Sequence, residues 1–351
     1  MKRNLLFVLA AAAVVASCGP KDYTTVKCFY PSAESAPDTV EIVVGERLDT
    51  LIAVVDGKVE ARIPADARGL SYFVSDDQPV QFISDGSTIT IDLVEKTVTS
   101  SLKDGVQSRY TAFQEWADAF IEENQSKYAS LPEEEKEAFE KEYTDKLNEH
   151  LLELVDANPD NVLCLIGVSS LMLDDEAEML RVLQSLSNEM KQSPTVVDMI
   201  STIESQMATA EGKMFQDFAV VQVPEDEEGS TVKLSDYIGK GKYILVDFWA
   251  SWCKPYQDEL PYLQEVYKQF KGDNFDMLSI AVNDALTDTM IAARTWGVTW
   301  NLIANAQSIP VAVYGLETIP YTILFGPDGT ILKRGMRGEE IGKAVAEALG
   351  K

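Results

Sequence analysis

The chain contains few histidines and few positive charges. Its 351 residues include one histidine, His150, and 30 lysines and arginines against 57 aspartates and glutamates, for a formal net charge of -27. One histidine leaves almost nothing for cysteine–histidine nucleophile pairs or histidine-based metal sites. Nucleic-acid binding needs clustered cations on phosphates. We therefore expect no metal, no cofactor and no nucleic-acid partner.

Long apolar runs are also scarce, and the most distinctive one lies at the amino terminus. Lys2 and Arg3 precede the apolar run 5–16, which is too short to span a bilayer and ends in Val-Ala-Ser-Cys at Cys18. This tetrad resembles the bacterial lipobox, although an ordinary signal peptide would look similar. We predict a signal peptide at 1–17, a tether at 18–23 and a lipid on Cys18. The protein would then be a membrane-anchored lipoprotein of the cell envelope, facing the periplasm or the cell surface.

Residues 24–100 are predicted to form a small antiparallel β domain. Short alternating runs recur through this segment, and Asp56-Gly57 and Asp85-Gly86 lie at positions typical of hairpin turns. No acid pair, metal-ligand cluster or phosphate loop is found in it. Its expected role is packing, spacing or partner recognition.

Residues 101–211 are predicted to be helical. Apolar residues recur at spacings of three and four, Pro132 fits a first helical turn, and Asn158-Pro159 ends that helix. Further helices are expected at 161–173, 175–190 and 194–210. His150 lies in this segment without a partner motif, so we assign it no catalytic role.

Residues 212–351 alternate strands with helices, which predicts an α/β sheet with crossover helices. The expected strands are 243–249, 275–282, 321–325 and 331–334, and the expected helices are 255–271, 287–296 and 339–349. Cys253 stands just before the first of these helices, and Pro255 fits its first turn. A helix start supplies unpaired N–H groups that stabilise a cysteine thiolate.

The segment around Cys253 carries a specific resemblance. Residues 246–261 read VDFWASWCKPYQDELP, and a later run, YGLETIPYTILFGPDGTILKRGMRGEE, contains Ile319-Pro320 and a PDG hairpin. Together they resemble the TlpA/ResA-like branch of thioredoxin-fold thiol-disulfide oxidoreductases over about the last 140 residues. The upstream order also resembles Bacteroidetes lipoproteins in which a small β domain and a helical segment precede such a module. The resemblance implies a thioredoxin-like C-terminal domain at 212–351.

Family roles are carried over residue by residue. Cys253 takes the place of the nucleophile, Asp247 that of a buried acid assisting proton transfer, and Glu259 that of a glutamate kept near the active site. Pro320 matches the family's cis-proline, and the residue before it presents its backbone to a bound peptide. The residues expected to contact substrate are Trp252, Pro255, Tyr256, Ile319 and Pro320.

Tyr256 stands where the family carries its second, resolving cysteine. A tyrosine cannot attack a mixed disulfide, so this module alone cannot complete disulfide reduction. Our leading hypothesis is monothiol exchange through Cys253 with thiol- or disulfide-containing proteins or small thiols. Cys28, near the tether, is a better candidate for a resolving thiol than Cys164, which lies in an apolar run. The alternatives are an inactive binding or scaffolding protein and, last, a thiol peroxidase-like protein.

Overall fold

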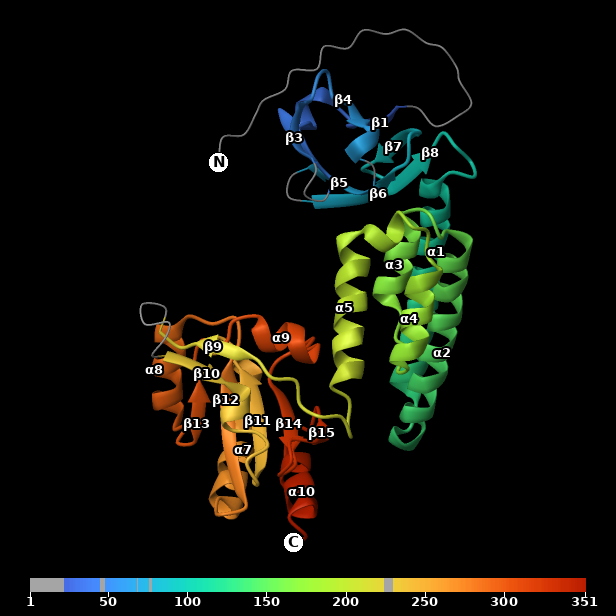
Figure 1. Cartoon of the computed structure of the whole chain (residues 1–351). Coiled ribbons are helices and arrows are strands. Elements are labelled where there is room, and N and C mark those ends of the chain that lie inside the picture. The colour runs from blue at the N-terminus through green and yellow to red at the C-terminus, as the bar shows by residue number, and fades with distance from the viewer. Residues whose placement is uncertain (1–21, 45–47, 68, 76–77, 224–229) are drawn as a thin grey trace. The chain divides into compact units, whose positions relative to one another are not determined.

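The structure, a computed structural model, describes residues 22–44, 48–67, 69–75, 78–223 and 230–351. The signal peptide and the lipid attachment predicted at Cys18 lie outside these residues. The chain divides into two compact units. The first consists of the chain up to Asp174 together with Arg181–Gln192, and the second of Asp175–Leu180 and Ser193–Lys351. Figure 1 labels their elements.

The first unit begins with a β sandwich of two four-stranded sheets. One sheet has the order β4-β1-β7-β8 and the other β3-β2-β5-β6. The strands are β1 (Tyr23–Phe29), β2 (Thr39–Val44), β3 (Leu48–Ala53), β4 (Lys58–Pro64), β5 (Gly69–Ser75), β6 (Gln78–Ser84), β7 (Thr88–Asp92) and β8 (Thr97–Ser100).

Alternation along the strands explains the sandwich core. In β4, every second residue is buried, and these residues, Val59, Ala61 and Ile63, face a core shared with both sheets. The predicted β domain is therefore confirmed. Two details differ from the sequence prediction. β1 pairs with β7 in parallel, and Asp85-Gly86 is not a hairpin turn but connects β6 in one sheet with β7 in the other.

Helices follow the sandwich. They are α1 (Val106–Ser130), α2 (Glu133–Ala157), α3 (Val162–Ser170), α4 (Glu176–Ser185) and α5 (Pro194–Ala208), the last of which belongs to the second unit. The predicted helix at 175–190 is shorter than expected, because α4 ends at Ser185. His150 stacks on Trp116 with ring centroids 3.6 Å apart, which is consistent with a packing role.

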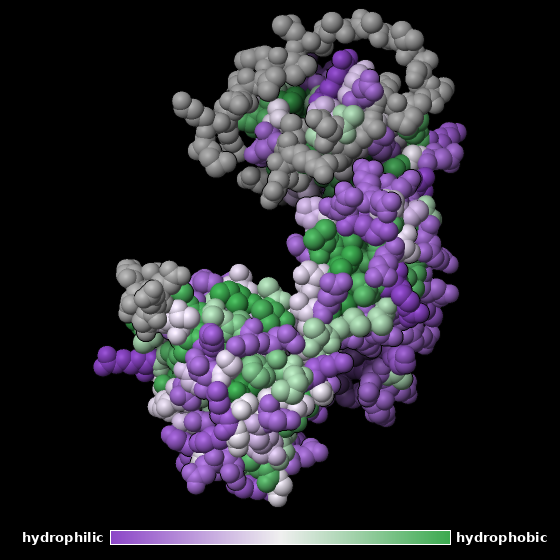
Figure 2. Space-filling model, in the orientation of Figure 1, coloured by the Kyte–Doolittle hydropathy of each residue, from purple (hydrophilic) through white to green (hydrophobic). Residues whose placement is uncertain are grey.

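The α1–α2 hairpin carries much of the acidic surface. Ion pairs between residues three or four apart, such as Glu123–Lys127 and Glu142–Lys146, line its exposed faces. Figure 2 shows hydrophilic residues covering the outer side of α2. Within the described ranges, no helix combines the length and apolar character that crossing a membrane requires.

The second unit contains a five-stranded sheet of order β13-β12-β11-β14-β15. Its elements are β11 (Tyr243–Trp249), α7 (Lys254–Phe270), β12 (Phe275–Ala281), α8 (Leu286–Trp296), β13 (Asn301–Ile303), α9 (Ile309–Tyr314), β14 (Tyr321–Phe325), β15 (Ile331–Arg334) and α10 (Glu339–Ala348). A separate two-stranded sheet joins β9 (Ala219–Val221) to β10 (Thr231–Lys233). The predicted α/β thioredoxin-like class is confirmed.

The central strand β11 is buried on both faces and sends alternate side chains to two cores. Leu245 and Trp249 face the core built with α7 and α10, whereas Ile244 and Val246 face the core on the other side of the sheet. Asp247 lies between Leu245 and Trp249 in this alternation. Its carboxyl group therefore points beneath α7.

Candidate active site

Cys253 lies at the junction between β11 and α7. It is the N-cap residue of α7, and Pro255 occupies the first turn of that helix. The Cys253 Sγ donates to the main-chain oxygen of Ile319 at 3.5 Å, and the Ile319–Pro320 peptide bond is cis. The fold thus brings the thiol at the start of α7 next to the Ile319–Pro320 segment, which lies more than 60 residues later in the sequence.

Tyr256 lies one helical turn after Cys253 and points into the core. Its side chain is 0% exposed and stacks on Trp249, with ring centroids 4.8 Å apart. Its hydroxyl donates to Asp247 Oδ2 at 3.0 Å. The sequence prediction that Tyr256 contacts substrate does not fit this burial, because a fully enclosed ring has no surface to offer a ligand. The substitution instead fills the space between the helix start and the buried acid.

Asp247 is completely enclosed. Its carboxylate is removed from water, and this burial raises its pKa to about 7, although hydrogen bonds from Ser279, Tyr256 and Trp300 act in the opposite direction. Burial and the neighbouring Asp247 also raise the pKa of Tyr256 well above its ordinary value. The tyrosine is therefore neutral at physiological pH and acts as a hydrogen-bond donor to the acid.

Two residues of this buried network were not predicted. Ser279, on β12, donates to Asp247 Oδ1 at 2.8 Å, and Trp300 Nε1 donates to Ser279 Oγ at 2.7 Å. Ser279 is the only polar side chain buried in the apolar stretch 277–281 of β12. That isolated serine in an apolar strand is the signal that sequence reasoning passed over. For Trp300, no sequence signal was available.

Glu259 lies on the same helix, at the edge of the site. It is 8% exposed, and its Oε1 accepts the backbone N–H of Gly338 at 2.9 Å. This bond ties α7 to the turn preceding α10. The hydrogen bond to Gly338 gives Glu259 a structural role, and its predicted catalytic role remains a proposal.

The outer face of the site is formed by residues expected to contact substrate. Trp252 is 62% exposed, and its Nε1 donates to Asn283 O at 3.1 Å. Pro255 is also exposed, whereas Ile319 is half-buried and Pro320 is buried.

Asp284 was not predicted, but it fixes the loop that carries Trp252. Its carboxylate accepts from the Ser251 N–H and hydroxyl at 2.6 and 2.8 Å.

The other two described cysteines are poor resolving thiols. Cys28 in β1 and Cys164 in α3 are both 0% exposed, and desolvation raises the pKa of each thiol to about 11. The burial of Cys164 confirms the sequence prediction. The preference for Cys28 as a resolving thiol was wrong, because β1 is an inner strand of the sandwich and Cys28 points into its core.

The arrangement defines the chemistry that is available. One thiol at a helix start can attack a disulfide, whereas the position that would supply the second thiol holds an aromatic ring bonded to a buried acid. Among the residues that the structure describes, no group of three or more histidine, cysteine, aspartate or glutamate side chains is placed to hold a metal ion. The fold and the site define a thioredoxin-fold protein of the thiol-disulfide oxidoreductase class.

Comparisons with known proteins agree with this class. The sequence profile of the AhpC/TSA family matches residues 211–334. The thiol-disulfide oxidoreductase ResA of Geobacillus thermodenitrificans is 30% identical over 126 residues, which cover 36% of this chain and 69% of that protein. ResA of Bacillus subtilis is 29% identical over 111 residues, 32% of this chain and 61% of that protein. The chain thus belongs to the AhpC/TSA family of thioredoxin-fold proteins, among relatives of the ResA type.

Solved structures from Bacteroides match the same part of the chain. A solution structure of a thiol:disulfide interchange protein from Bacteroides sp. is 28% identical and covers 41% of this chain and 93% of its own, with a TM-score of 0.36. The thioredoxin domain of a thiol-disulfide oxidoreductase from Bacteroides vulgatus is 27% identical and covers 39% of this chain and 96% of its own, with a TM-score of 0.34.

Proposed function

We propose that the second unit performs single-thiol exchange with disulfides through Cys253. The thiolate attacks one sulfur of a substrate disulfide; a new bond forms between Cys253 and that sulfur, and the other sulfur leaves as a thiolate. The observation that supports this most is the placement of Cys253 Sγ at the start of α7, 3.5 Å from the Ile319 oxygen. That oxygen belongs to the segment that would face a bound peptide.

The reaction stops at the mixed disulfide because the unit has no second thiol. Tyr256 occupies the resolving position, and the buried Cys28 and Cys164 belong to the other unit. Release therefore requires a thiol from a small molecule or from a protein. That thiol attacks the mixed disulfide, forms a disulfide with the substrate sulfur and leaves Cys253 as a thiolate. The expected partners are thiol- or disulfide-containing proteins and small thiols.

Intact-mass measurement of the full chain after incubation with glutathione disulfide tests this proposal. We expect a single glutathionyl adduct that dithiothreitol removes and that Cys253→Ser abolishes. Cys164→Ala is the matched control, because it removes a buried thiol and should leave the adduct intact. An adduct that persists in Cys253→Ser, or none at all with excess disulfide, contradicts single-thiol exchange.

A non-catalytic binding role is the alternative, and one observation favours it. Cys253 is only 3% exposed, so its sulfur presents little surface to a reagent. This role predicts an unmodified chain that nevertheless binds peptides near Trp252. A thiol peroxidase-like role ranks third and predicts a sulfenic acid on Cys253 after treatment with peroxide.

We also propose that the protein is a lipoprotein of the cell envelope, on the sequence of residues 1–18 alone. Cleavage before Cys18 and a lipid on its sulfur would anchor the protein, with residues 18–23 as tether and the parts 24–100, 101–211 and 212–351 beyond it. Cys18→Ala should move the protein from the membrane to the soluble fraction of its source cells. Membrane retention of that variant would contradict the anchor.

A further inference from the structure

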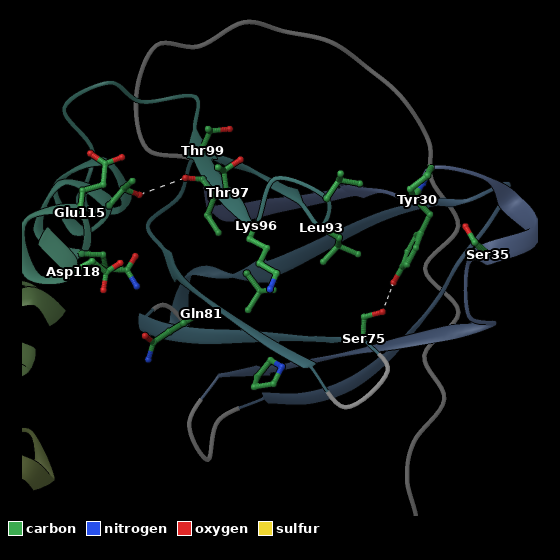
Figure 3. Close-up of a pocket in the computed structure, with 17 residues that line it drawn as sticks. Tyr30, Ser35, Ser75, Gln81, Leu93, Lys96, Thr97, Thr99, Glu115 and Asp118 are labelled. Carbon is green, nitrogen blue, oxygen red and sulfur yellow. Dashed lines mark hydrogen bonds between the residues drawn. The ribbon is translucent and has the colours of Figure 1, made fainter. Parts of the chain in front are cut away.

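A cavity in the first unit lies outside the site described above. It has a volume of about 970 Å³ and lies between the two sheets of the sandwich and the part of α1 from Thr111 to Asp118. Figure 3 shows Thr97 and Thr99 on one side of it, Gln81 on the opposite side and Glu115 and Asp118 on the helix. Lys96 extends between these groups.

Two open sheet edges border this cavity. β6 ends one sheet and β8 ends the other, so each has only one neighbouring strand among the described residues. The cavity is lined by consecutive residues of both, Pro79–Gln81 on β6 and Thr97–Thr99 on β8, and by Lys96 in the turn before β8. Side chains of successive strand residues point to opposite faces. Consecutive residues can line one cavity only where the edge of the strand, with its main-chain groups, borders it.

The hydrogen-bond pattern identifies the main-chain groups that face the cavity. Ser101 N donates to Thr88 O, so the pairs between β7 and β8 alternate from that point and Val98 is in a non-hydrogen-bonded pair with Ile91. The Val98 N–H and C=O therefore point away from β7. On β6, Ile83 N donates to the side chain of Gln107, so the main-chain groups of Ile83 point away from β5. The main-chain groups of Gln81 and Pro79, two and four residues earlier, point the same way.

The helix α1 covers only the far end of these edges. Gln107 accepts from Ile83 N on β6, and Thr111 Oγ1 donates to Val98 O at 3.4 Å on β8. From Thr111 to Asp118, α1 lines the cavity. The Gln81 main chain and the Val98 N–H are thus presented to the cavity without a strand partner among the described residues. Such edges are templates for an added strand.

The rest of the lining indicates what kind of strand would fit. Val80, Leu93 and Val98 are half-buried, pack against the sandwich core and form an apolar floor. Glu115 and Asp118 are exposed on α1 one turn apart, and they place two carboxylates at the helix end of the cavity. Lys96, held at φ 54 in the β7–β8 turn, supplies a single positive charge.

We propose that this cavity binds an extended peptide segment of a partner protein by strand addition. The peptide would pair its main chain with β6 or β8, place alternate apolar side chains on the floor, and place a lysine or arginine against Glu115 and Asp118. The unit would then tether a partner to the chain that carries Cys253, without contributing to the chemistry at that thiol. This proposal is independent of the single-thiol reaction at Cys253.

The test measures binding of a fluorescent peptide to the full chain by fluorescence anisotropy. The probe is about eight residues long, enough to span the edge at about 3.3 Å per residue, with alternating valine and threonine and an arginine at each end. Two methylated probes keep the same side chains, and each has one of the two alternate sets of backbone nitrogens methylated. Only one of these sets contains the donors needed for strand pairing. We expect methylation on the pairing edge to weaken binding by about tenfold or more, because several main-chain bonds are lost.

Protein variants test the charge assignment. Glu115→Lys should weaken binding of the arginine probe several-fold and favour a probe with glutamate at its ends. Glu122→Lys is the matched control, because it lies two turns further along α1, is exposed and does not line the cavity. Glycine tolerates the positive φ of this position, so Lys96→Gly removes the positive charge without straining the turn. Binding of the arginine probe should stay the same or become stronger.

Three results would overturn the proposal. They are equal binding of both sets of methylated probes, no binding at millimolar peptide, and concentration-dependent dimerisation of the chain that excludes the probe. The last result would mean that the edges pair with a second copy of the chain.

Discussion

Cys28 and Cys253 are both buried, but they lie in different surroundings. Cys28 is enclosed in the sandwich core by side chains of its own sheet, such as Val59 and Ile91, and of the other sheet, such as Phe73. Cys253 is at a helix start, beside a main-chain oxygen of a distant loop, and one helical turn before Tyr256, whose hydroxyl donates to the buried acid Asp247. Burial alone therefore does not distinguish a cysteine in a packed core from the one that we propose to react. The groups that surround the sulfur do.

The two cores also differ in how they treat polar atoms. The sandwich buries hydroxyl groups such as those of Ser71 and Ser84, whereas the core beneath α7 encloses a carboxyl group together with a phenol, a hydroxyl and an indole N–H. Buried polar groups are costly unless every member is hydrogen-bonded. In the network around Asp247, the Tyr256 hydroxyl, the Ser279 hydroxyl and the Trp300 indole N–H each make a hydrogen bond.

The largest expected change comes from Tyr256→Cys, which would give the second unit two thiols. We expect disulfide reduction in the insulin precipitation assay to increase at least about tenfold with dithiothreitol as reductant, because the second thiol makes release intramolecular. The loss of a buried ring should also destabilise the unit by about 3–5 kcal/mol. Tyr256→Ser is the control, since it creates a similar cavity without a thiol. Equal rates for both variants would show that wider parts of the site have lost competence.

The next largest effect is expected from Ser279→Ala. It leaves Asp247 and the Trp300 N–H with fewer partners in a closed core, at a cost of about 2–3 kcal/mol. Ser71→Ala in the sandwich is the matched variant, because Ser71 is equally buried but bonds only to the Gly69 oxygen and to Ser84. We expect it to cost about 1 kcal/mol. Urea unfolding followed by fluorescence and by hydrogen exchange would compare them, and equal costs would contradict the special role of the network.

A pH dependence follows from the Asp247 pKa of about 7. The folded protein holds a proton that the unfolded chain, with an ordinary aspartate, releases near pH 4. The contribution of this group to stability is therefore fully present below pH 4 and is lost as the pH rises towards 7, with a slope of up to about 1.4 kcal/mol per pH unit.

Two variants isolate that slope. Asp247→Asn should remove it, because the amide does not titrate. Tyr256→Phe deletes a hydrogen bond to the carboxylate and should extend the loss of stability to higher pH. Urea unfolding between pH 4 and 9 gives the slopes. A slope that survives in Asp247→Asn would assign it to other groups.

The smallest change is expected from Cys28→Ala. Removing one buried sulfur should destabilise the sandwich by about 1 kcal/mol and leave the glutathione adduct at Cys253 unchanged. Thermal unfolding and intact mass measure the two effects. Loss of the adduct in this variant would mean that Cys28 takes part in the exchange.

The sequence allowed much of the fold to be predicted because the signals were local. The alternation of strand-like and helical segments located β11, β12 and β14, and Pro255 marked the start of α7. Strand partners were less accessible, because a local pattern shows that a segment is a strand and not which strand lies beside it. The Asp85-Gly86 turn was thus assigned to a hairpin although it joins two sheets.

The sequence indicated which residues form the site, but not how their side chains contact one another. The motif placed Cys253, Asp247 and Pro320 in one frame, but the inward direction of Tyr256 depends on the alternation that puts Asp247 under α7. Asp284 and Trp300 contribute through contacts made only in the folded chain. The burial of Cys28 was missed for a related reason, since the partners of β1 come from distant strands.

Native-state alkylation tests the central claim most directly. The full chain is treated with iodoacetamide without denaturant, and the labelled cysteines are identified by peptide mass mapping over time. We predict that Cys253 is labelled first, and that Cys28 and Cys164 react only when the first unit unfolds. Equal protection of all three, or earlier labelling of Cys28, would contradict the assignment of Cys253 as the functional thiol.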